Sequence, residues 1–276
     1  MHIACTICLT NTHLALKDQS SKMYHCNNCD HSFNVVSGDW RLQYSEDYYT
    51  KKHTNWFNNP NYWLFEFIHT NIERFSRKEK EIKLADIGCG KGDLLKYLKE
   101  KKSNLKLYGM DLSQNYDSDI NFIKGDFLKD NIDMQFDVVS SLAAIEHVDN
   151  ITLFAKKLNR LLKPGGLLIV MTDNTKSIIH KIAEILKHVG WKTPFYSLYE
   201  PAHLNHFSNH SLKNLLENQG FEIIIQRNHN YPLKAVDLPT NNLILKNFYL
   251  FAMWIFFSLP RKFGILQTII CRKNLL

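Results

Sequence analysis

The stretch LADIGCGKGDLL, residues 84–95, places three glycines at alternate positions directly behind a short apolar run. This pattern predicts a buried strand that turns sharply into a helix. Such a turn can hold a dinucleotide pyrophosphate, the phosphates of a nucleoside triphosphate, or a ligand that carries no phosphate. The surrounding residues decide between these three ligands.

Strand-like and helix-like segments alternate along the chain around this turn. Strands are expected at 83–87, 106–110, 121–124, 136–141 and 167–172, and helices at about 93–102, 151–162 and 176–189. The alternation predicts an α/β fold with a doubly wound, mostly parallel sheet that helices cover on both faces. Ligands bind such sheets at the carboxyl ends of the strands.

The residues of the turn argue against a phosphate ligand. A P-loop requires a Lys and then a Ser or Thr after its last glycine, whereas Gly92 is followed by Asp93 and Leu94. The G-x-G-x-G spacing also brings the third glycine one residue too early for a dinucleotide fingerprint. Asp86, just before the glycines, would repel a pyrophosphate but could pair with an ammonium group. Asp111, about twenty residues on, suits ribose hydroxyls in either case.

The ordered set of motifs resembles the class I S-adenosylmethionine-dependent methyltransferases over about residues 80–230. The matching motifs are Asp86-Ile-Gly88-Cys-Gly90-Lys-Gly92, Gly109-Met-Asp111-Leu-Ser113, Gly125-Asp126-Phe127, Phe136-Asp137-Val-Val with Glu146-His147-Val148, and Leu162-Lys-Pro-Gly-Gly166. The resemblance implies a Rossmann-like sheet that ends in an antiparallel hairpin, for which the segments 221–227 and 266–272 are the expected strands.

The resemblance also implies S-adenosyl-L-methionine as the cofactor. The glycine turn would lie against its methionine part, Asp111 would hold the ribose hydroxyls, and Asp126 with Phe127 the adenine. The complete expected cofactor set is Asp86, Gly88, Gly90, Gly92, Asp111, Leu112, Asp126, Phe127 and Ser141. A turn carboxylate at a strand end is the alternative role for each aspartate. Glu146 is expected either near the cofactor or as a helix cap.

Two histidines are the candidates for a catalytic base. His203 and His206 lie in the segment that lines the acceptor pocket in this family, and histidine titrates near neutral pH. Their alternative role is to orient the loop or cap the following helix. The acceptor itself is an unidentified small molecule, for which a sugar, a lipid-linked compound and a secondary-metabolite intermediate are the options.

Four of the six cysteines predict a structural zinc ribbon over residues 1–42. Cys5 and Cys8 form one C-x-x-C pair and Cys26 and Cys29 another, with seventeen residues between the pairs, which is a zinc-site spacing. An all-cysteine shell leaves no open position for chemistry, so the metal is expected to be structural. The ribbon resembles that of bacterial methyltransferases, including sugar C-methyltransferases, although the C-terminus here is shorter. Residues 43–276 are expected to form the methyltransferase domain.

An apolar insert is expected at about 231–262, within the methyltransferase domain. Its uninterrupted apolar stretch, 248–257, is too short to span a bilayer. A helix on its own sheet or on a second subunit, as in a homodimer, is the favoured interpretation, and peripheral membrane contact through 243–262 is the alternative.

The N-terminal residues and the charge bear on localisation and partners. The N-terminus lacks the pattern of a secretion signal, so we expect a cytoplasmic protein, with the inner face of the membrane as the alternative site. The net charge is +7, but the ribbon has few clustered cations, which argues against nucleic acid as a partner. The rival functions are a nicotinamide-dependent oxidoreductase and a non-catalytic zinc-ribbon binding protein.

Overall fold

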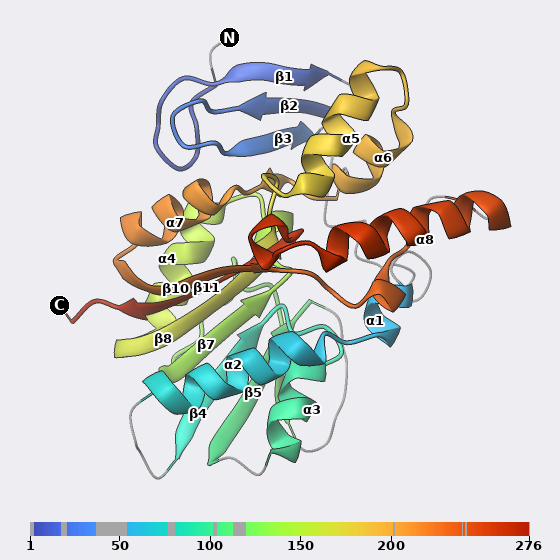
Figure 1. The fold of residues 1–276 in the computed structure, drawn as a ribbon. Helices are drawn as coiled ribbons and strands as arrows, with labels where there is room; N and C mark the ends of the chain where they lie inside the picture. Colours follow the sequence, from blue (N-terminus) through green and yellow to red (C-terminus); the bar gives the residue numbers. More distant parts are fainter. Residues whose placement is uncertain are drawn as a thin grey trace.

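The computed structural model describes residues 3–17, 21–36, 54–76, 81–101, 104–112, 120–200, 202–238, 240 and 242–275. They form a large sheet covered by helices and a small sheet stacked at one end (Figure 1). The expected boundary between residues 42 and 43 lies outside the described residues, as does Ser113.

The large sheet has seven strands in the order β10-β11-β8-β7-β4-β5-β6. β4 at its centre pairs in parallel with both β5 and β7, and β10, β11 and β8 pair antiparallel. The strands are β4 (Ile82–Ile87), β5 (Leu105–Asp111), β6 (Asn121–Lys124), β7 (Phe136–Leu142), β8 (Leu162–Asp173), β10 (Phe221–His229) and β11 (Leu266–Lys273). This arrangement confirms the expected doubly wound sheet and its antiparallel hairpin. The order reverses at β4, which places the glycine turn at the switch point.

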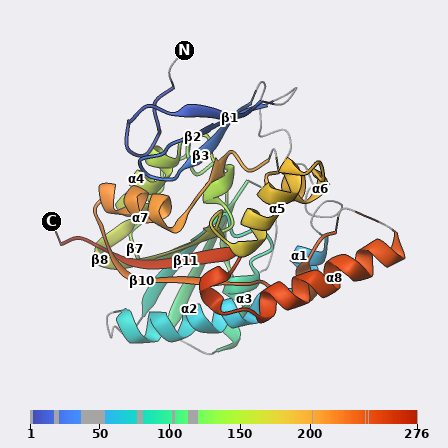
Figure 2. The same ribbon diagram turned by 45° about the horizontal axis from the view of Figure 1, so that its top comes forward.

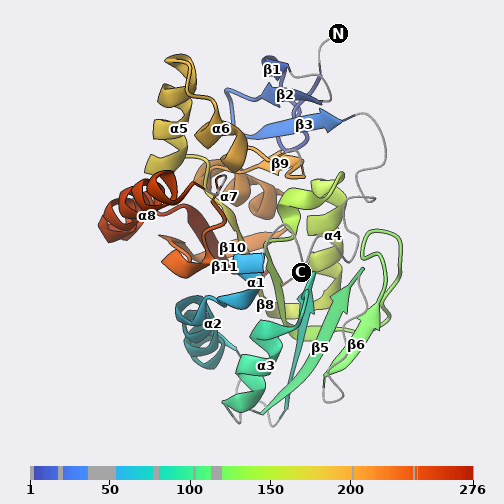
Figure 3. The ribbon, with the colours of Figure 1, turned by 90° about the vertical axis from the view of Figure 1, so that its right-hand side faces the viewer.

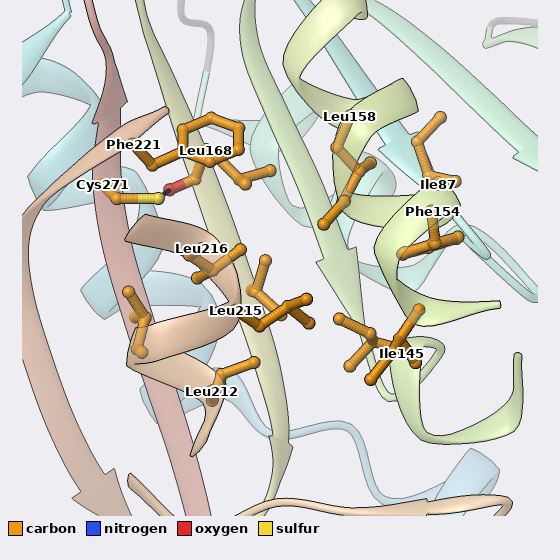
Figure 4. Close-up of a cluster of buried hydrophobic side chains, with 14 of the residues drawn as sticks. Ile87, Ile145, Phe154, Leu158, Leu168, Leu212, Leu215, Leu216, Phe221 and Cys271 are labelled. Atoms are coloured by element: carbon orange, nitrogen blue, oxygen red, sulfur yellow. Dashed lines mark hydrogen bonds between the residues drawn. The ribbon is translucent and has the colours of Figure 1, made fainter. Parts of the chain in front are cut away.

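Helices cover both faces of this sheet, because its central strands are buried on both sides. Val138 of β7 joins the apolar cluster beneath α2 (Tyr62–Phe75) and α3 (Asp93–Glu100). The next residue, Val139, joins the opposite cluster beneath α4 (Ile151–Leu161) and α7 (Asn209–Asn218). Figure 4 shows this second cluster, with Leu158 of α4 and Leu215 of α7 among its labelled side chains.

The segment Leu162–Gly166 differs from its expected form. The expected helix at about 151–162 and the expected strand at 167–172 leave residues 163–166 between them, but β8 already begins at Leu162. The register of β8 on β7 shifts within this segment, because Phe136 pairs with Leu162 and Val138 with Leu167. Gly165 has a φ of 76°, so the Pro-Gly-Gly sequence forms an irregularity inside the strand.

The small sheet joins the N-terminal ribbon to the large domain. It contains β1 (His13–Lys17), β2 (Ser21–His25) and β3 (Ser32–Val36), and β9 (Asn205–His206) adds a fourth strand from the large domain. Figure 3 shows β9 beside β3. The ribbon therefore pairs with the chain segment that carries the candidate histidines.

The remaining helices lie around the carboxyl ends of the strands, with α5 and α6 beside the ribbon and α8 projecting from the body (Figure 2). They are α1 (Thr54–Asn58), η3 (Ile145–His147), α5 (Ile178–His188), α6 (Thr193–Leu198), η4 (Leu233–Ala235), α8 (Leu243–Ser258) and η5 (Arg261–Phe263). No residue of α8 is buried, but Phe257 near its end is partly buried and packs against the apolar cluster on one face of the large sheet. None of the helices in the described part of the chain has the length and apolar content for a membrane crossing.

Candidate functional site

The glycine turn between β4 and α3 has a backbone that only glycine adopts easily. Gly88, Gly90 and Gly92 have φ angles of 76°, 52° and 73°. A Cβ atom on Gly88 would lie 2.7 Å from the Cβ atom of Ala144, so the backbone approaches the β7 loop closely there. The amide of Gly90 donates a hydrogen bond to Oδ2 of Asp111 at 2.9 Å, which ties the turn to the end of β5.

Asp86 is a buried carboxylate at the end of β4. It is 3% exposed and accepts a hydrogen bond from Oγ of Ser140 at 2.8 Å. Its pKa is raised to about 6, mainly by burial. The hydrogen bond from Ser140 opposes this shift, and the charge of Asp111 adds to it. A buried carboxylate without a cationic partner is costly, and a ligand ammonium group would supply the missing charge.

A cavity of about 400 Å³ opens in front of the turn. Eight of the eleven candidate cofactor and catalytic residues line it: Asp86, Gly88, Gly90, Asp111, Leu112, Asp126, Phe127 and His203. This volume lies in the range of small-molecule sites.

Asp126 and Phe127, expected at the adenine end of the cofactor site, both line the cavity and also have structural contacts. Asp126 accepts a hydrogen bond from the amide of Leu128 at 3.0 Å, as a turn carboxylate does, and also lines the cavity. The ring of Phe127 packs edge-on against Phe154, with centroids 5.2 Å apart. The aspartate is thus held by its own turn and the ring by the core.

Three candidate residues lie outside the cavity lining. Gly92 is the N-cap of α3. Ser141 is fully buried and its hydroxyl donates to the carbonyl of Ile87 at 3.0 Å, so it links β7 to β4. His206 lies in β9, where its Nε2 is 3.1 Å from Nδ2 of Asn34 in the ribbon. Burial, followed by the nearby histidines, lowers the pKa of His206 well below its usual value.

Another part of the cavity lining, around η3 and the end of β8, carries a cluster of titratable groups. Nδ1 of His203 lies 3.3 Å from Oδ2 of Asp173, and its ring meets the ring of His147 edge-on at 4.7 Å. Glu146 is 3% exposed, and its Oε2 accepts a hydrogen bond from the hydroxyl of Thr172 at 2.8 Å. The potential ligand atoms of Glu146, His147 and His203 lie within 4.8 Å of one another.

The charges of this cluster are coupled. Burial disfavours the charged form of His203. Its hydrogen bond with Asp173 and the charges of Asp173, Glu146 and Glu200 nevertheless raise its pKa to about 9. Burial raises the pKa of Glu146 to about 7, with His203 opposing the shift and Asp173 adding to it. At neutral pH His203 is therefore mostly an imidazolium, and Glu146 is the group whose pKa suits proton transfer.

Sequence reasoning missed Asp173 and gave His147 no role of its own, and it expected Glu146 either near the cofactor or as a helix cap. Glu146 and His147 were recognised as part of a motif, but their side chains form the wall of the cavity in the short helix η3. Asp173 directly follows the expected strand at 167–172, so the rule that ligands bind at strand ends could have identified it. Its partner His203 is thirty residues away in sequence.

The four ribbon cysteines gather at one point. Sγ of Cys5 lies 3.5 Å from Sγ of Cys29, and Sγ of Cys8 lies 3.5 Å from Sγ of Cys26. All four sulfur atoms lie within 4.8 Å of one another, and none forms a disulfide. Zinc–sulfur bonds of about 2.3 Å in a tetrahedron separate the sulfurs by about 3.8 Å. The donor set thus fits one tetrahedral zinc ion.

The fold and the glycine-turn cavity define a class I S-adenosylmethionine-dependent methyltransferase. Residues 61–226, more than half of the chain, match the methyltransferase domain family, and the chain belongs to that family.

Two curated relatives and one solved structure illustrate the similarity. The chain is 32% identical over 122 residues to (S)-tetrahydroprotoberberine N-methyltransferase of Eschscholzia californica, covering 40% of this chain and 35% of that protein. It is 29% identical over 137 residues to ubiquinone biosynthesis O-methyltransferase of Rickettsia bellii, covering 45% and 57% respectively. A complex of the Haloferax volcanii Trm112 activator with a putative methyltransferase shares the fold, with a TM-score of 0.54, 16% identity, and coverage of 87% of this chain and 100% of that one. The matches thus span less than two thirds of the curated relatives.

Proposed function

We propose that this protein transfers a methyl group from S-adenosyl-L-methionine to a small molecule in the cavity between β4 and η3. The observation that carries this proposal is the arrangement of the cavity wall. Asp86, Asp111 and the glycine turn line one part of this single cavity, and Glu146 and His203 line another. The first part suits a ligand with an ammonium group and ribose hydroxyls, and the other suits an acceptor that must lose a proton.

The residues at the glycine turn bind and orient the cofactor. Asp86 pairs with the ammonium group, Asp111 accepts hydrogen bonds from the ribose hydroxyls, and Asp126 with Phe127 holds the adenine. The close approach of Gly88 to Ala144 supports this role, because a side chain on the turn would require the backbone to shift. The cofactor, when bound, supplies a methyl group that is already activated on a sulfonium.

The residues at η3 and β8 prepare the acceptor. Glu146 accepts the acceptor's proton at a carboxylate oxygen, since its pKa of about 7 leaves a large ionised fraction at neutral pH. His203, kept protonated by Asp173, donates a hydrogen bond to the acceptor oxygen and stabilises negative charge there. This assignment revises the expectation that His203 is itself the base. It also gives His206, which belongs to the ribbon interface, no part in proton transfer.

The ribbon cysteines hold a structural zinc ion in this proposal. The two C-x-x-C turns converge although the described part of the ribbon has a small core, and metal binding then supplies folding free energy. The paired strands β3 and β9 carry this support to the segment around His203. The amide Nδ2 of Asn34 donates to the carbonyl of His203 at 2.9 Å. Metal binding in the ribbon is therefore expected to hold the acceptor wall in place.

The acceptor class and the partners are also proposals. The relatives include a tetrahydroprotoberberine N-methyltransferase and a ubiquinone biosynthesis O-methyltransferase, and on this similarity we propose an apolar ring-containing or lipid-linked acceptor. A sugar or secondary-metabolite intermediate is the alternative. A peripheral membrane contact through 243–262 is the proposed interaction, and a homodimer is the alternative.

Calorimetric titration of the purified zinc-loaded protein tests the cofactor assignment. We expect S-adenosylhomocysteine to bind at one site and NAD not to bind. Asp111→Asn should weaken S-adenosylhomocysteine about tenfold to a hundredfold, because it weakens hydrogen bonds to a charged acceptor worth about 1.5–3 kcal/mol. Asp133→Asn, at an exposed position, is the matched control. Binding of NAD alone would support an oxidoreductase, and binding of neither would support a non-catalytic protein.

A further inference from the structure

The helix α8 carries a large apolar surface that the described part of the chain leaves uncovered. Ile244, Phe248, Phe251 and Ile255 follow one another at helical spacing, and Trp254 lies beside them. Their exposed fractions run from 41% for Ile255 to 83% for Ile244. Single exposed apolar residues are common on protein surfaces, but a continuous stripe of this size marks an interaction site.

The inner side of α8 attaches it to the body without burying it. Tyr249 packs against Trp191 at 6.0 Å between ring centroids, and Phe257 meets Tyr231 edge-on at 5.3 Å. Figures 1 and 2 show the helix extending from the body between the α5–α6 side and α2. The stripe is thus held outward by fixed aromatic contacts at the helix's inner side.

The charged residues of α8 and η5 are all positive. Lys246 lies within the helix, Arg261 and Lys262 follow it, and all three are exposed. The segment 243–263 contains no Asp or Glu. Apolar and aromatic side chains flanked by Lys and Arg suit the interface of an anionic bilayer, where acyl chains receive the rings and headgroups the cations.

A second copy of the chain suits this surface less well. A two-fold contact through α8 would bring the same segment of the partner opposite, with the same cations and no acidic residue to pair with them. The helix is also about 24 Å long at 1.5 Å per residue, shorter than the hydrocarbon core of a bilayer. It can lie on a membrane but cannot cross one.

We propose that α8 docks this protein on the surface of an anionic lipid bilayer, with Phe248, Phe251 and Trp254 inserted at the level of the headgroups. This interaction goes beyond the proposed methyl transfer and does not depend on it. One end of α8 packs on η4, and Tyr231, Pro232 and Ala235 in that region line the cavity. A docked protein therefore holds this edge of its cavity near the membrane.

Vesicle co-sedimentation of the full-length, zinc-loaded protein tests the proposal. We expect binding to phosphatidylcholine vesicles that contain phosphatidylglycerol, and weaker binding to phosphatidylcholine alone. The double variant Phe248→Glu/Phe251→Glu should reduce partitioning at least tenfold. Both positions are exposed, so the fold is expected to tolerate the change. The matched control Leu14→Glu/Leu153→Glu changes the charge equally at exposed apolar positions on the ribbon and α4 and should bind like the wild type.

Two further measurements keep the proposal open to refutation. Lys246→Gln/Lys262→Gln should lose the preference for anionic vesicles while retaining weak binding to neutral ones. Sedimentation velocity without lipid should show a monomer over a range of concentrations. Absence of binding to every vesicle, or equal binding of the α8 variant and its control, would overturn the proposal. A dimer that the Phe248→Glu/Phe251→Glu variant abolishes would also overturn it, because a second copy would then cover the stripe.

Discussion

Replacing Asp86 by Asn separates the cost of burying this carboxylate from its benefit to the cofactor site. Burial raises its pKa from 3.8 to about 6, and a shift of about 2 units corresponds to roughly 3 kcal/mol. The folded protein binds the proton more tightly than the unfolded chain does. The stabilisation is therefore fully present below the unfolded-state pKa and is lost as the pH rises through the folded-state pKa. The resulting penalty grows from about 1.6 kcal/mol at pH 5 to about 3 kcal/mol at pH 7.5.

The Asp86→Asn variant should escape this penalty, because its amide cannot ionise while its oxygen still accepts the Ser140 hydrogen bond. We expect its free energy of unfolding, minus that of the wild type, to rise by about 1.4 kcal/mol between pH 5 and pH 7.5. Urea unfolding of both proteins at each pH, followed by circular dichroism, measures this difference. Other titrating groups and the zinc site occur in both proteins and cancel. Affinity for S-adenosylhomocysteine at pH 7.5 should fall at least tenfold, because the charged partner of its ammonium group is gone.

The pH dependence of the unfolding free energy and the affinity for S-adenosylhomocysteine test two separate parts of this reasoning. A stability difference that does not change with pH would refute the argument that burial raises the pKa of Asp86. The predicted stability change with unchanged S-adenosylhomocysteine affinity would leave the burial argument intact and remove Asp86 from the cofactor site. The exposed carboxylate at Asp133 is again the control, since Asp133→Asn should change neither quantity.

Three further predictions concern the acceptor wall, the turn and the ribbon. In the wild type, the rate of methyl transfer should rise as the pH passes about 7 and Glu146 ionises. Glu146→Gln should lower kcat about a hundredfold or more and remove that rise from the pH–rate profile. It should leave the affinity for S-adenosylhomocysteine unchanged. Gly88→Ala should abolish S-adenosylhomocysteine binding in calorimetry because of the contact with Ala144, whereas Gly190→Ala, which shares a positive φ but meets nothing within 4 Å, should bind normally. Cys26→Ser should lose the zinc ion by elemental analysis and lower both Tm and kcat, whereas Cys89→Ser should keep the metal. Full zinc content in the Cys26 variant would contradict the proposed four-cysteine site.

The glycine turn and the ribbon cysteines could be predicted because their geometry is local. A strand that must turn within a few residues needs positive φ angles, and the alternate glycines at 88, 90 and 92 provide them. Two residues between Cys5 and Cys8 bring both thiols to one side of a tight turn, whatever the rest of the fold does. The strands of the main sheet were likewise predictable, since burial on both faces requires continuous apolar runs.

The acceptor wall could not be predicted because it depends on contacts between distant segments. His203 lies near Glu146 and Asp173 because tertiary contacts hold its segment in place. β9 pairs with the ribbon strand β3, more than 160 residues earlier in the sequence, and Nδ2 of Asn205 donates to the carbonyl of Val148 beside η3. Burial lowers the pKa of both His203 and His206, but the hydrogen bond with Asp173 raises that of His203, so two histidines three positions apart receive opposite pKa shifts. Neither shift can be read from residue type, because burial and neighbouring charges decide it.

The amino-acid sequence by itself determined the sheet, its glycine turn and the cysteine spacing of the ribbon, since each follows from backbone sterics and apolar periodicity within a short segment. Only the tertiary structure decided which carboxylates and histidines face the cavity, and that the apolar run of α8 stays on the surface although its composition resembles that of a core helix. The physical reason is that desolvation and Coulomb interactions depend on distances between segments that the chain brings together only when it folds.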